Sequence, residues 1–369
     1  MKTLPYLFLA LCLSIAFTSC NTKQKETSSS NADSTATVAR DVWTKEQAMA
    51  WYQPWGWLRG CDFIPSTAIN QLEMWQAETF DTATINRELG YAESIGMNAM
   101  RVYLHHLAWE IDQDGFKDRM NQFLTIADKH GISTLFVIFD DCWNPGYQPG
   151  KQPDPKPGIH NSGWVRDPGD IIHEDSTVIV SLEKYVKDIL TFFGNDNRIL
   201  LWDLYNEPGN SGYGNKSMPL LQKAFQWGRE VNPSQPLSAG VWSKDLVDLN
   251  NYQLQNSDVI TYHNYSTPDD HKKWIDSLRT YGRPLICTEY MARTRGSRFD
   301  NIMPMLKSEN VGAFNWGLVS GKTNTIYAWD APMPDGKEPK VWFHDIFRKD
   351  GTPYDKKEVD LIRSLTSVK

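Results

Sequence analysis

The chain has 369 residues, of which 40% are hydrophobic and 22% are charged, and it contains 15 tryptophans. This composition excludes collagen-like and wholly disordered proteins, and the length allows a large hydrophobic core. A net charge of −7 provides no broad basic surface, so we expect no nucleic-acid partner. The tryptophans exceed what an ordinary core needs, and the excess indicates either dense core packing or rings displayed to a ligand.

The first twenty residues are typical of an export signal. Met1 and Lys2 precede an apolar run from Leu4 to Phe17, which is too short to span a bilayer and fits a secretory signal. The segment 17–20, Phe-Thr-Ser-Cys, resembles the relaxed lipobox of Bacteroides-like lipoproteins. We therefore predict a signal peptide over residues 1–20 with a lipid on Cys20. The alternative is ordinary cleavage near Ser19.

A polar segment follows the signal. Residues 21–39 are rich in Ser, Thr, Asn and Lys and contain no aromatic residue, which predicts a flexible tether over residues 21–41. The folded domain is then expected over residues 42–369. These features predict a bacterial outer-membrane lipoprotein, monomeric, held to the membrane only by its lipid and facing either the periplasm or the cell exterior.

Short apolar runs alternate with helical patterns through the rest of the chain. The runs predict strands over residues 57–64, 97–104, 134–139, 199–205, 237–241, 259–265, 284–289 and 312–318. Apolar residues at helical spacing predict helices over residues 81–95, 116–127, 178–193, 218–231, 274–281 and 357–365. Eight such units predict a single α/β domain, a (β/α)8 TIM barrel. A doubly wound open sheet is the alternative, but no G-x-G-x-x-G follows the first strand.

Two connections are long, over residues 140–175 and 319–339. They follow the third and eighth predicted strands, so they are enlarged βα loops 3 and 8 of the barrel. Long loops in a folded domain are usually functional, and the βα loops of a barrel build its active-site face.

No cofactor or metal is expected. Cys61, Cys142 and Cys287 form no C-x-x-C pair, and the sequence contains no H-E-x-x-H motif. His105 and His106 are adjacent, and we expect their rings on opposite faces of a strand, where they cannot share a metal ion.

Two glutamates end predicted strands. The strand over residues 199–205 runs into Asn206-Glu207-Pro208, and the strand over residues 284–289 ends at Glu289. Proline cannot extend a central strand, so Glu207 lies at its carboxyl end. In a barrel both carboxylates then face the same opening. Such a pair is what glycoside hydrolysis needs, because one carboxyl group protonates the leaving oxygen while the other attacks or activates water.

The chain resembles glycoside hydrolase clan A, and most nearly family 5, from about Trp57 to Trp316. The matching motifs are Asn206-Glu207-Pro208, the strand-end Glu289, the G-x-N-x-x-R pattern ending at Arg101, the H-x-Y pattern of His263 and Tyr265, and Trp316. This resemblance implies a barrel fold, with Glu207 as the acid/base, Glu289 as the nucleophile and retention of anomeric configuration.

The other matching residues have physical roles consistent with this chemistry. Arg101 and the hydroxyl of Tyr265 would stabilise an ionised Glu289, and His263 shares a strand face with Tyr265. Asn206 could bind the 2-hydroxyl of the sugar, and Trp316 could lie beneath the ring.

One position departs from the family pattern. Cys142 stands where the third strand of family 5 usually ends with histidine, and His106 is a better candidate than His105 to replace it. Loop 3 carries Trp143 and Trp164, which either bind sugar or pack within the loop. We therefore predict substrate-binding residues at the following positions: Arg101, His106, Trp143, Asn206, His263, Tyr265 and Trp316.

The sequence predicts a retaining glycoside hydrolase that cleaves β-linked bonds of a plant or microbial polysaccharide or oligosaccharide by double displacement. Enlarged loops that wall the cleft would favour a short or branched carbohydrate. The alternatives are a transglycosylase that uses the same glutamates and a non-catalytic surface glycan-binding lipoprotein.

Overall fold

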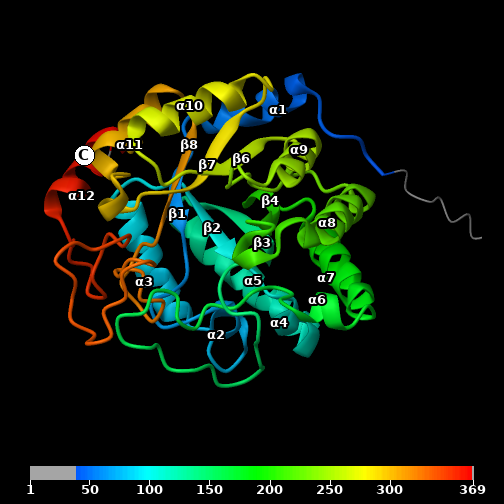
Figure 1. The fold of residues 1–369 in the computed structure, drawn as a ribbon, viewed down its shortest axis with the longest axis horizontal. Coiled ribbons are helices and arrows are strands. Elements are labelled where there is room, and N and C mark those ends of the chain that lie inside the picture. Colours follow the sequence, from blue (N-terminus) through cyan, green and yellow to red (C-terminus); the bar gives the residue numbers. More distant parts are fainter. Residues whose placement is uncertain (1–38, 368–369) are drawn as a thin grey trace, which may run out of the picture. The chain divides into compact units, whose positions relative to one another are not determined.

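Eight parallel strands form the centre of the structure, a computed structural model that describes residues 39–367 (Figure 1). The predicted signal peptide over residues 1–20, the lipid on Cys20 and most of the tether over residues 21–41 lie outside the described residues. The strands are β1 (Arg59–Asp62), β2 (Ala99–Tyr103), β3 (Ser133–Asp140), β4 (Ile199–Asn206), β5 (Leu237–Ser238), β6 (Ile260–His263), β7 (Leu285–Tyr290) and β8 (Gly312–Trp316).

Except for β5 and β6, each strand pairs with its neighbours in chain order, and β1 also pairs with β8. Between β5 and β6 the sheet is joined by a single parallel bridge, from Val241 to Tyr262. This bridge nearly closes the sheet into a barrel, which confirms the predicted (β/α)8 fold. The strands are buried on both faces, as their continuous apolar sequences require; every residue of β4 is buried.

The helices surround the barrel and return the chain to its amino-terminal side (Figure 1). They are α1 (Lys45–Tyr52), α2 (Gln71–Trp75), α3 (Thr82–Ser94), α4 (His106–Ile111), α5 (Gln113–Lys129), α6 (Ile171–Glu174), α7 (Val178–Phe193), α8 (Met218–Val231), α9 (Val247–Asn256), α10 (Pro268–Arg279), α11 (Phe299–Ser308) and α12 (Lys356–Thr366). None of the helices among the described residues is long and apolar enough to cross a membrane.

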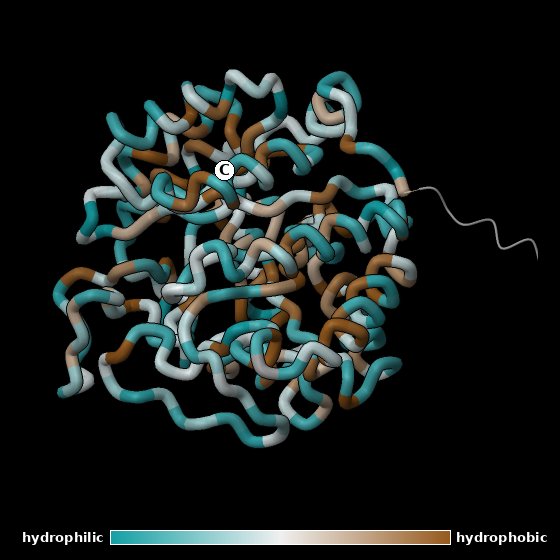
Figure 2. The backbone as a smooth tube through the Cα atoms, turned by 45° about the vertical axis from the view of Figure 1, so that its right-hand side comes forward, coloured by the Kyte–Doolittle hydropathy of each residue, from teal (hydrophilic) through white to brown (hydrophobic). Residues whose placement is uncertain are grey.

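Two of the longer helices, α9 and α11, are not among the predicted ranges, and neither are the shorter α1, α2, α4 and α6. Helix α9 buries only Leu249 and Gln253, so it carries no continuous apolar stripe. Helix α11 contains Pro304, which removes a backbone donor and interrupts the helical pattern. Hydrophobic segments lie mainly in the interior strands and on the inner faces of helices, and the connecting loops are mostly hydrophilic (Figure 2).

The enlarged loops 3 and 8 lie at the carboxyl ends of the strands and are hydrogen-bonded to each other. The backbone N–H of Asn161 donates to the carbonyl of Thr323 at 2.8 Å, and that of Met333 donates to the carbonyl of Gly158 at 3.0 Å. Gly158 has a φ of +66°, and a Cβ there would clash with the Met333 carbonyl. Only glycine permits this close approach, so the two loops form one wall of the barrel opening.

Candidate active site

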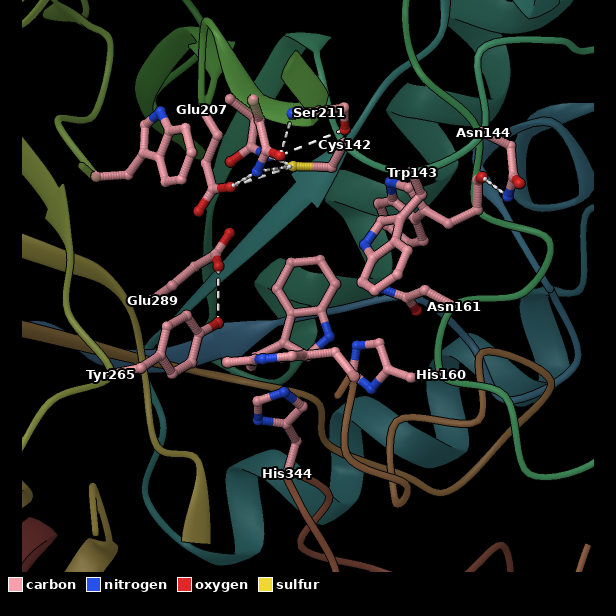
Figure 3. Close-up of a pocket in the computed structure, with 16 residues that line it drawn as sticks. Cys142, Trp143, Asn144, His160, Asn161, Glu207, Ser211, Tyr265, Glu289 and His344 are labelled. Carbon is pink, nitrogen blue, oxygen red and sulfur yellow. Dashed lines mark hydrogen bonds between the residues drawn. The ribbon is translucent and has the colours of Figure 1, made fainter. Parts of the chain in front are cut away.

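A cavity of about 580 Å³ opens where the carboxyl ends of the strands meet loops 3 and 8 (Figure 3). Its size falls within the range of about 300–1,000 Å³ that is usual for small-molecule sites. Both Glu207 and Glu289 line it. Five tryptophans line it as well: Trp143, Trp164, Trp242, Trp316 and Trp329. The tryptophan excess in the composition is therefore partly explained by rings gathered around this cavity.

Glu289 lies on β7, and both of its carboxylate oxygens accept hydrogen bonds. Oε1 accepts from Nη1 of Arg101 and from the hydroxyl of Tyr103, each at 2.9 Å. Oε2 accepts from the hydroxyl of Tyr265 at 2.7 Å. A carboxylate held by three donors, one of them cationic, is stabilised in its charged form and fixed in orientation. This is the arrangement expected for a nucleophile.

Tyr103 was not among the predicted site residues. It follows Arg101 by two positions on β2, so the period of the strand brings both side chains to the same face. Burial raises the pKa of Tyr103 well above its usual value, so the hydroxyl remains a donor to Glu289.

Arg101 is fully buried and lies at the centre of a charged cluster. Besides Glu289 it pairs with Asp62 at 2.8 Å and with Asp203 at 2.8 Å, and it donates to Oδ1 of Asn206 at 2.7 Å. Burial raises the pKa of Asp62 well above its usual value despite the neighbouring Arg101. Asp62 lies on β1, directly opposite Arg101 in the register of β1 and β2, and Asp203 lies on β4, two strands away from Arg101 on the other side.

Asn206 is placed beside the cavity with its amide fixed by neighbours. Its Nδ2 donates to Oδ1 of Asp140 at 2.8 Å and to Sγ of Cys142 at 3.4 Å. Nη2 of Arg101 donates to Oδ1 of Asn206, so hydrogen bonds to both the nitrogen and the oxygen fix the orientation of the amide.

Glu207 follows directly after β4 with a backbone φ of 45°, a left-handed conformation that is rare for a residue other than glycine. Such conformations concentrate at functional sites, because the surrounding structure must hold them in place. Pro208 ends the strand and the turn directs the carboxyl group into the cavity.

The Glu207 carboxyl group has three protein partners. Oε1 hydrogen-bonds with Nδ1 of His263 at 2.7 Å, and Oε2 accepts from the Cys142 thiol at 3.3 Å and from Nδ2 of Asn210. Burial raises the pKa of Glu207, and the bonds from Cys142 and Asn210 partly oppose that rise. A carboxyl group biased towards its protonated form is suited to donate a proton.

His263 lies between the two glutamates. Burial lowers its pKa to about 4, so the ring is neutral at pH 7. Its Nδ1 lies 3.5 Å from Oε2 of Glu289 as well as 2.7 Å from Glu207. Oxygen atoms of Glu207 and Glu289 and a ring nitrogen of His263 all lie within 4.8 Å of one another. The two carboxyl groups therefore lie close together across the cavity.

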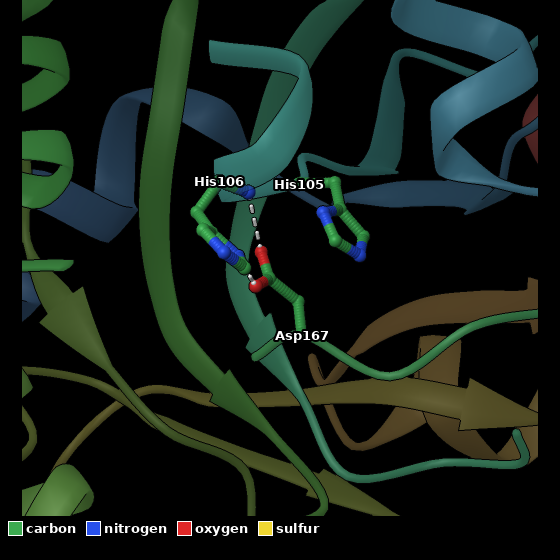
Figure 4. Close-up of side chains that lie close together, drawn as sticks. All are labelled: His105, His106 and Asp167. Atoms are coloured by element: carbon green, nitrogen blue, oxygen red, sulfur yellow. Dashed lines mark hydrogen bonds and ion pairs between the residues drawn. The ribbon is translucent and has the colours of Figure 1, made fainter. Parts of the chain in front are cut away.

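The structure corrects the prediction that His106 replaces the missing family histidine. His106 is buried, and its Nδ1 and backbone N–H both bind the carboxylate of Asp167 in loop 3 (Figure 4). Its Nε2 lies 3.4 Å from the hydroxyl of Tyr147. The ring supports loop 3 and does not line the cavity. Cys142 itself lines the cavity and contacts Glu207.

The expectation that His105 and His106 point to opposite faces of a strand is also wrong. Strand β2 ends at Tyr103 and α4 begins at His106, so the rings stack with centroids 5.2 Å apart. Together with Asp167 they lie close enough to surround a metal ion. However, Nδ1 of His105 accepts from the Leu107 N–H and Nε2 donates to the Arg166 carbonyl, so neither nitrogen offers a free lone pair.

The tryptophans of the cavity differ in accessibility. Trp143 is 37% exposed, whereas Trp164 is buried and donates from Nε1 to Asp140 at 2.7 Å. Trp164 also packs edge-on against Trp316 with centroids 5.4 Å apart, and Tyr103 supports Trp316 from another side. Trp164 thus packs within the fold against Trp316, whereas Trp143 is exposed at the opening, and sugar binding by Trp143 stays a prediction.

A second cavity, of about 660 Å³, adjoins the first. It shares Glu207, Trp242, Tyr265 and Trp329 with the first cavity, but Glu289 does not line it. The two cavities together form a path that passes Glu207.

Comparisons with known proteins agree with the barrel fold. The cellulase family, glycosyl hydrolase family 5, matches residues 65–322. No curated protein matches the sequence. Among solved structures, an endo-1,4-beta-D-mannanase from Thermotoga petrophila RKU-1 is similar, with a TM-score of 0.52 and 14% identity, over 85% of this chain and 99% of that chain.

Two further structures are similar in fold. A GH5_18 protein from Streptomyces cattleya, in complex with Manb1-4GlcNAc, gives a TM-score of 0.59 at 9% identity over 84% of this chain and 80% of that chain. The exo-beta-1,4-mannosidase Op5Man5 from Opitutaceae bacterium strain TAV5 gives 0.58 at 16% identity over 84% of this chain and 59% of that chain. Since the family match spans more than half of the chain and the barrel agrees with it, the protein belongs to glycosyl hydrolase family 5 and is an O-glycosyl hydrolase.

Proposed function

We propose that the protein hydrolyses β-linked glycosidic bonds with retention of anomeric configuration, by double displacement. The observation that carries this proposal is the close approach of two strand-end carboxyl groups, since one oxygen of Glu207 lies within 4.8 Å of one oxygen of Glu289. Retaining enzymes hold their carboxyl groups about 5–5.5 Å apart, whereas inverting enzymes separate them by about 6.5–9.5 Å to admit a water molecule. The spacing favours direct attack by one carboxylate.

The environments of the two groups assign their roles. Glu289, held by Arg101, Tyr103 and Tyr265, attacks the anomeric carbon and forms a covalent glycosyl ester. Glu207, with its raised pKa, protonates the departing oxygen and the bond to the leaving group breaks. The deprotonated Glu207 then removes a proton from water, whose oxygen attacks the anomeric carbon and releases Glu289.

The substrate is a neutral or nearly neutral β-linked oligosaccharide or polysaccharide. Tryptophan rings around the cavity fit the C–H faces of sugars, and the polar groups between them fit hydroxyls. Loops 3 and 8 wall one side of the opening, which supports preference for a short or branched substrate.

The first experiment incubates the enzyme with mannan, glucan, xylan and galactan oligosaccharides and measures product size and anomeric configuration. An activated 2-fluoro glycoside of the cleaved sugar is then used to trap the intermediate for mass spectrometry. We expect the label on Glu289 and initial products of retained configuration. Glu207→Gln and Glu289→Gln should each lower kcat by several orders of magnitude, while circular dichroism shows the folded state.

Labelling of any other residue, inverted products, or full activity in either variant would overturn the assignment. A transglycosylase would use the same pair of glutamates, and it would be recognised by products longer than the substrate that replace free sugar at high acceptor concentration.

We further propose that Cys20 carries a lipid that attaches the enzyme to the bacterial outer membrane, with residues 21–41 as a tether. The support is the sequence alone, an apolar run from Leu4 to Phe17 that is followed by Thr18-Ser19-Cys20. Metabolic labelling with an alkyne fatty acid should mark the wild-type protein and not Cys20→Ser. Equal labelling of both would contradict lipidation at this residue, and protease treatment of whole cells would distinguish the two membrane faces.

A further inference from the structure

Three loops at the carboxyl ends of the strands are bonded to one another. Loop 1 covers residues 63–81 and joins β1 to α3, loop 3 joins β3 to α6, and loop 8 covers residues 317–355 and joins β8 to α12. Strands β8, β1, β2 and β3 are consecutive in the sheet, so these loops border one side of the barrel opening. Figure 1 shows loop 3 passing around α2, the short helix of loop 1. We call the three loops the three-loop wall.

Loop 3 is fixed to loop 1 by two side-chain amides. Nδ2 of Asn70 donates to the carbonyl of Gly163 and to Oε1 of Gln152, both at 2.9 Å. Nε2 of Gln71 donates to the carbonyl of Val165 at 2.9 Å. Both amides are buried, and breaking a buried hydrogen bond leaves its polar groups unsatisfied. These bonds therefore hold the two loops together.

Loop 8 is fixed to loop 1 through backbone contact and an ion pair. The backbone N–H of Lys322 donates to the carbonyl of Ser66 at 3.2 Å, and its Nζ pairs with Glu73 at 2.5 Å. Gly321 approaches Ser66 so closely that a Cβ there would lie 2.5 Å from the Cα of Ser66. The two loops thus leave no space between their backbones at this point.

Side chains strengthen the junction of loops 3 and 8, which two backbone hydrogen bonds already join. Nδ2 of Asn324 donates to the carbonyl of Lys156 at 2.8 Å. Nδ1 of His160 lies 2.8 Å from the carbonyl of Tyr327 and donates to it, since a carbonyl can only accept. Each loop of the three-loop wall is therefore bonded to the other two.

The inner side of loop 8 reaches the nucleophile. The rings of Trp329 and His344 pack against Tyr265 with centroids 5.1 and 5.7 Å apart, and the hydroxyl of Tyr265 donates to Glu289 at 2.7 Å. Figure 3 shows Tyr265 between Glu289 and His344. Loop 8 thus begins one ring beyond the nucleophile.

The inner side of loop 3 reaches the nucleophile in the same way. Trp164 is buried and packs against Tyr103 with centroids 5.0 Å apart and against Trp316 at 5.4 Å. The hydroxyl of Tyr103 donates to Glu289 at 2.9 Å. An indole ring therefore fills the space between loop 3 and the floor of the first cavity.

The nucleophile and the acid/base divide the active site into two sides. The ester forms between Glu289 and the glycone, so the glycone occupies the first cavity, which Glu289 lines together with residues of loops 3 and 8. The leaving group is protonated by Glu207 and continues into the second cavity, which Glu289 does not line. Among the described residues, Trp329 is the one member of the three-loop wall that lines the second cavity. The glycone therefore faces the three-loop wall, and the leaving group faces away from it.

The polarity of a saccharide fixes how its chain lies in the site. The glycone is the part towards the non-reducing end, and the leaving group carries the reducing end. A chain that continued beyond the glycone would have to pass between loops that are joined by hydrogen bonds. On the other side, the second cavity of about 660 Å³ provides room for the rest of the chain.

We propose that the three-loop wall closes the glycone side of the active site and makes the enzyme exo-acting. It releases a terminal unit of constant length, one or two sugar residues, from the non-reducing end, and the shortened chain leaves through the second cavity. This inference rests on the proposed function, because it takes the direction of the substrate from the roles of Glu207 and Glu289.

The test compares two probes that carry the same bulky fluorescent label at opposite ends. Both are the β-linked pentasaccharide of the sugar that the wild-type enzyme cleaves, labelled either on the reducing-end residue or on the non-reducing residue. Early products are separated by capillary electrophoresis. From the first probe we expect one labelled product, shortened by a constant unit. The second probe should not be cleaved, because its label cannot pass the three-loop wall.

A variant that separates loops 3 and 8 tests the barrier itself. Gly158 has a φ of +66°, and a Cβ there would lie 1.6 Å from the carbonyl oxygen of Met333, so Gly158→Ala forces the loops apart. The matched control is Gly150→Ala, also in loop 3, because Gly150 has a φ of +81° and nothing lies within 4 Å of its Cβ position. Both variants strain the backbone, and only Gly158→Ala disturbs the junction. We expect Gly158→Ala to cleave the probe labelled on its non-reducing residue, and Gly150→Ala to leave that probe intact.

A mixture of labelled lengths in the early digest, or cleavage of both probes at similar rates by the wild-type enzyme, would overturn the proposal. This comparison does not depend on how the variants fold. If circular dichroism shows that Gly158→Ala is folded and it still leaves the second probe intact, the junction of loops 3 and 8 is not the barrier.

The 2-fluoro glycoside distinguishes this failure from failure of the proposed function. If the wild-type enzyme is labelled at Glu289 and releases internal products, only the closed glycone side is wrong. If Glu289 is not labelled, the proposed function itself is wrong.

Discussion

Removal of the Tyr265 hydroxyl should expose the covalent step of the reaction. In the free enzyme this hydroxyl donates to Oε2 of Glu289 at 2.7 Å, while Arg101 and Tyr103 donate to Oε1. In the glycosyl ester Glu289 has lost its charge, and the charge returns as water releases the sugar. Tyr265→Phe therefore removes a donor from a carboxylate that is forming in the second transition state.

The magnitude follows from the contact. A hydrogen bond to a charged group contributes about 1.5–3 kcal/mol, and about 1.4 kcal/mol corresponds to a tenfold change in rate. Release of the sugar should therefore slow by about 10- to 150-fold. Formation of the ester should slow less. Tyr265 also stabilises the ionised Glu289 before attack, so the variant loses stabilisation from the ground state as well as from the first transition state, and the two losses partly cancel in the rate. The glycosyl-enzyme should accumulate.

The assay follows the release of phenolate from an activated aryl β-glycoside by stopped flow. In Tyr265→Phe we expect a burst equal to the enzyme concentration, then a slow steady state with kcat and KM both lowered. Tyr103→Phe should have a smaller effect, because Arg101 still donates to the same oxygen. Tyr185→Phe is the control: Tyr185 is fully buried, and its hydroxyl contacts only the Ile138 carbonyl, at 3.5 Å. Unchanged kcat and no burst in Tyr265→Phe would refute the assignment of Glu289 as the nucleophile and the stabilising effect of its hydrogen bond from Tyr265.

Cys142→Ala removes the thiol that donates to Glu207, a hydrogen bond that partly offsets the rise in the Glu207 pKa caused by burial. The pKa of Glu207 should therefore rise further, and the alkaline limb of the pH profile of kcat/KM should move to higher pH. A limb that stays in place or moves to lower pH would contradict the contact. Asp258 is fully buried, and its bonds to Arg40 and Arg229 hold its pKa below the usual value despite burial. Its contribution to stability is therefore fully present above the unfolded-state pKa of about 3.9 and is lost as the pH falls through the lower folded-state pKa. Asp258→Asn should lower the free energy of unfolding by about 3–5 kcal/mol at pH 7 and by less in acid, as measured by urea denaturation; an equal loss at both pH values would count against this linkage. Dialysis against EDTA should leave hydrolysis unchanged, and activity that is lost and then restored by a divalent cation would show that a metal takes part.

The positions of the two glutamates follow from local sequence. A buried parallel strand is a continuous apolar run, and a charged residue or proline ends it, so Glu207 and Glu289 are visible at the ends of β4 and β7. Because all parallel strands of a barrel end on one face, the sequence alone also brings both glutamates to one opening. The pairing of Arg101 with Glu289 is likewise accessible, through the family motif.

The partners of these groups were decided by the tertiary structure. Asn210 reaches Glu207 because of the left-handed turn at Glu207, and Cys142 reaches it because β3 and β4 end side by side, with Asp140 opposite Asn206. Neither contact leaves a periodic signal in the sequence. The partner of His106 is equally hidden in the sequence, because nothing near His106 in the chain predicts its hydrogen bonds with Asp167.

The sequence by itself determined the eight alternating units, the two strand-end glutamates and the family. Only the tertiary structure decided how the cavity is lined, because loops 3 and 8 have no repeating pattern and take their shape from contacts with each other. His160 and His344 are 184 positions apart in the chain, yet their ring centroids lie 5.4 Å apart. The alternation of strands and helices is visible in local sequence patterns. The position and protonation of these two rings instead depend on burial by segments that are distant in the sequence.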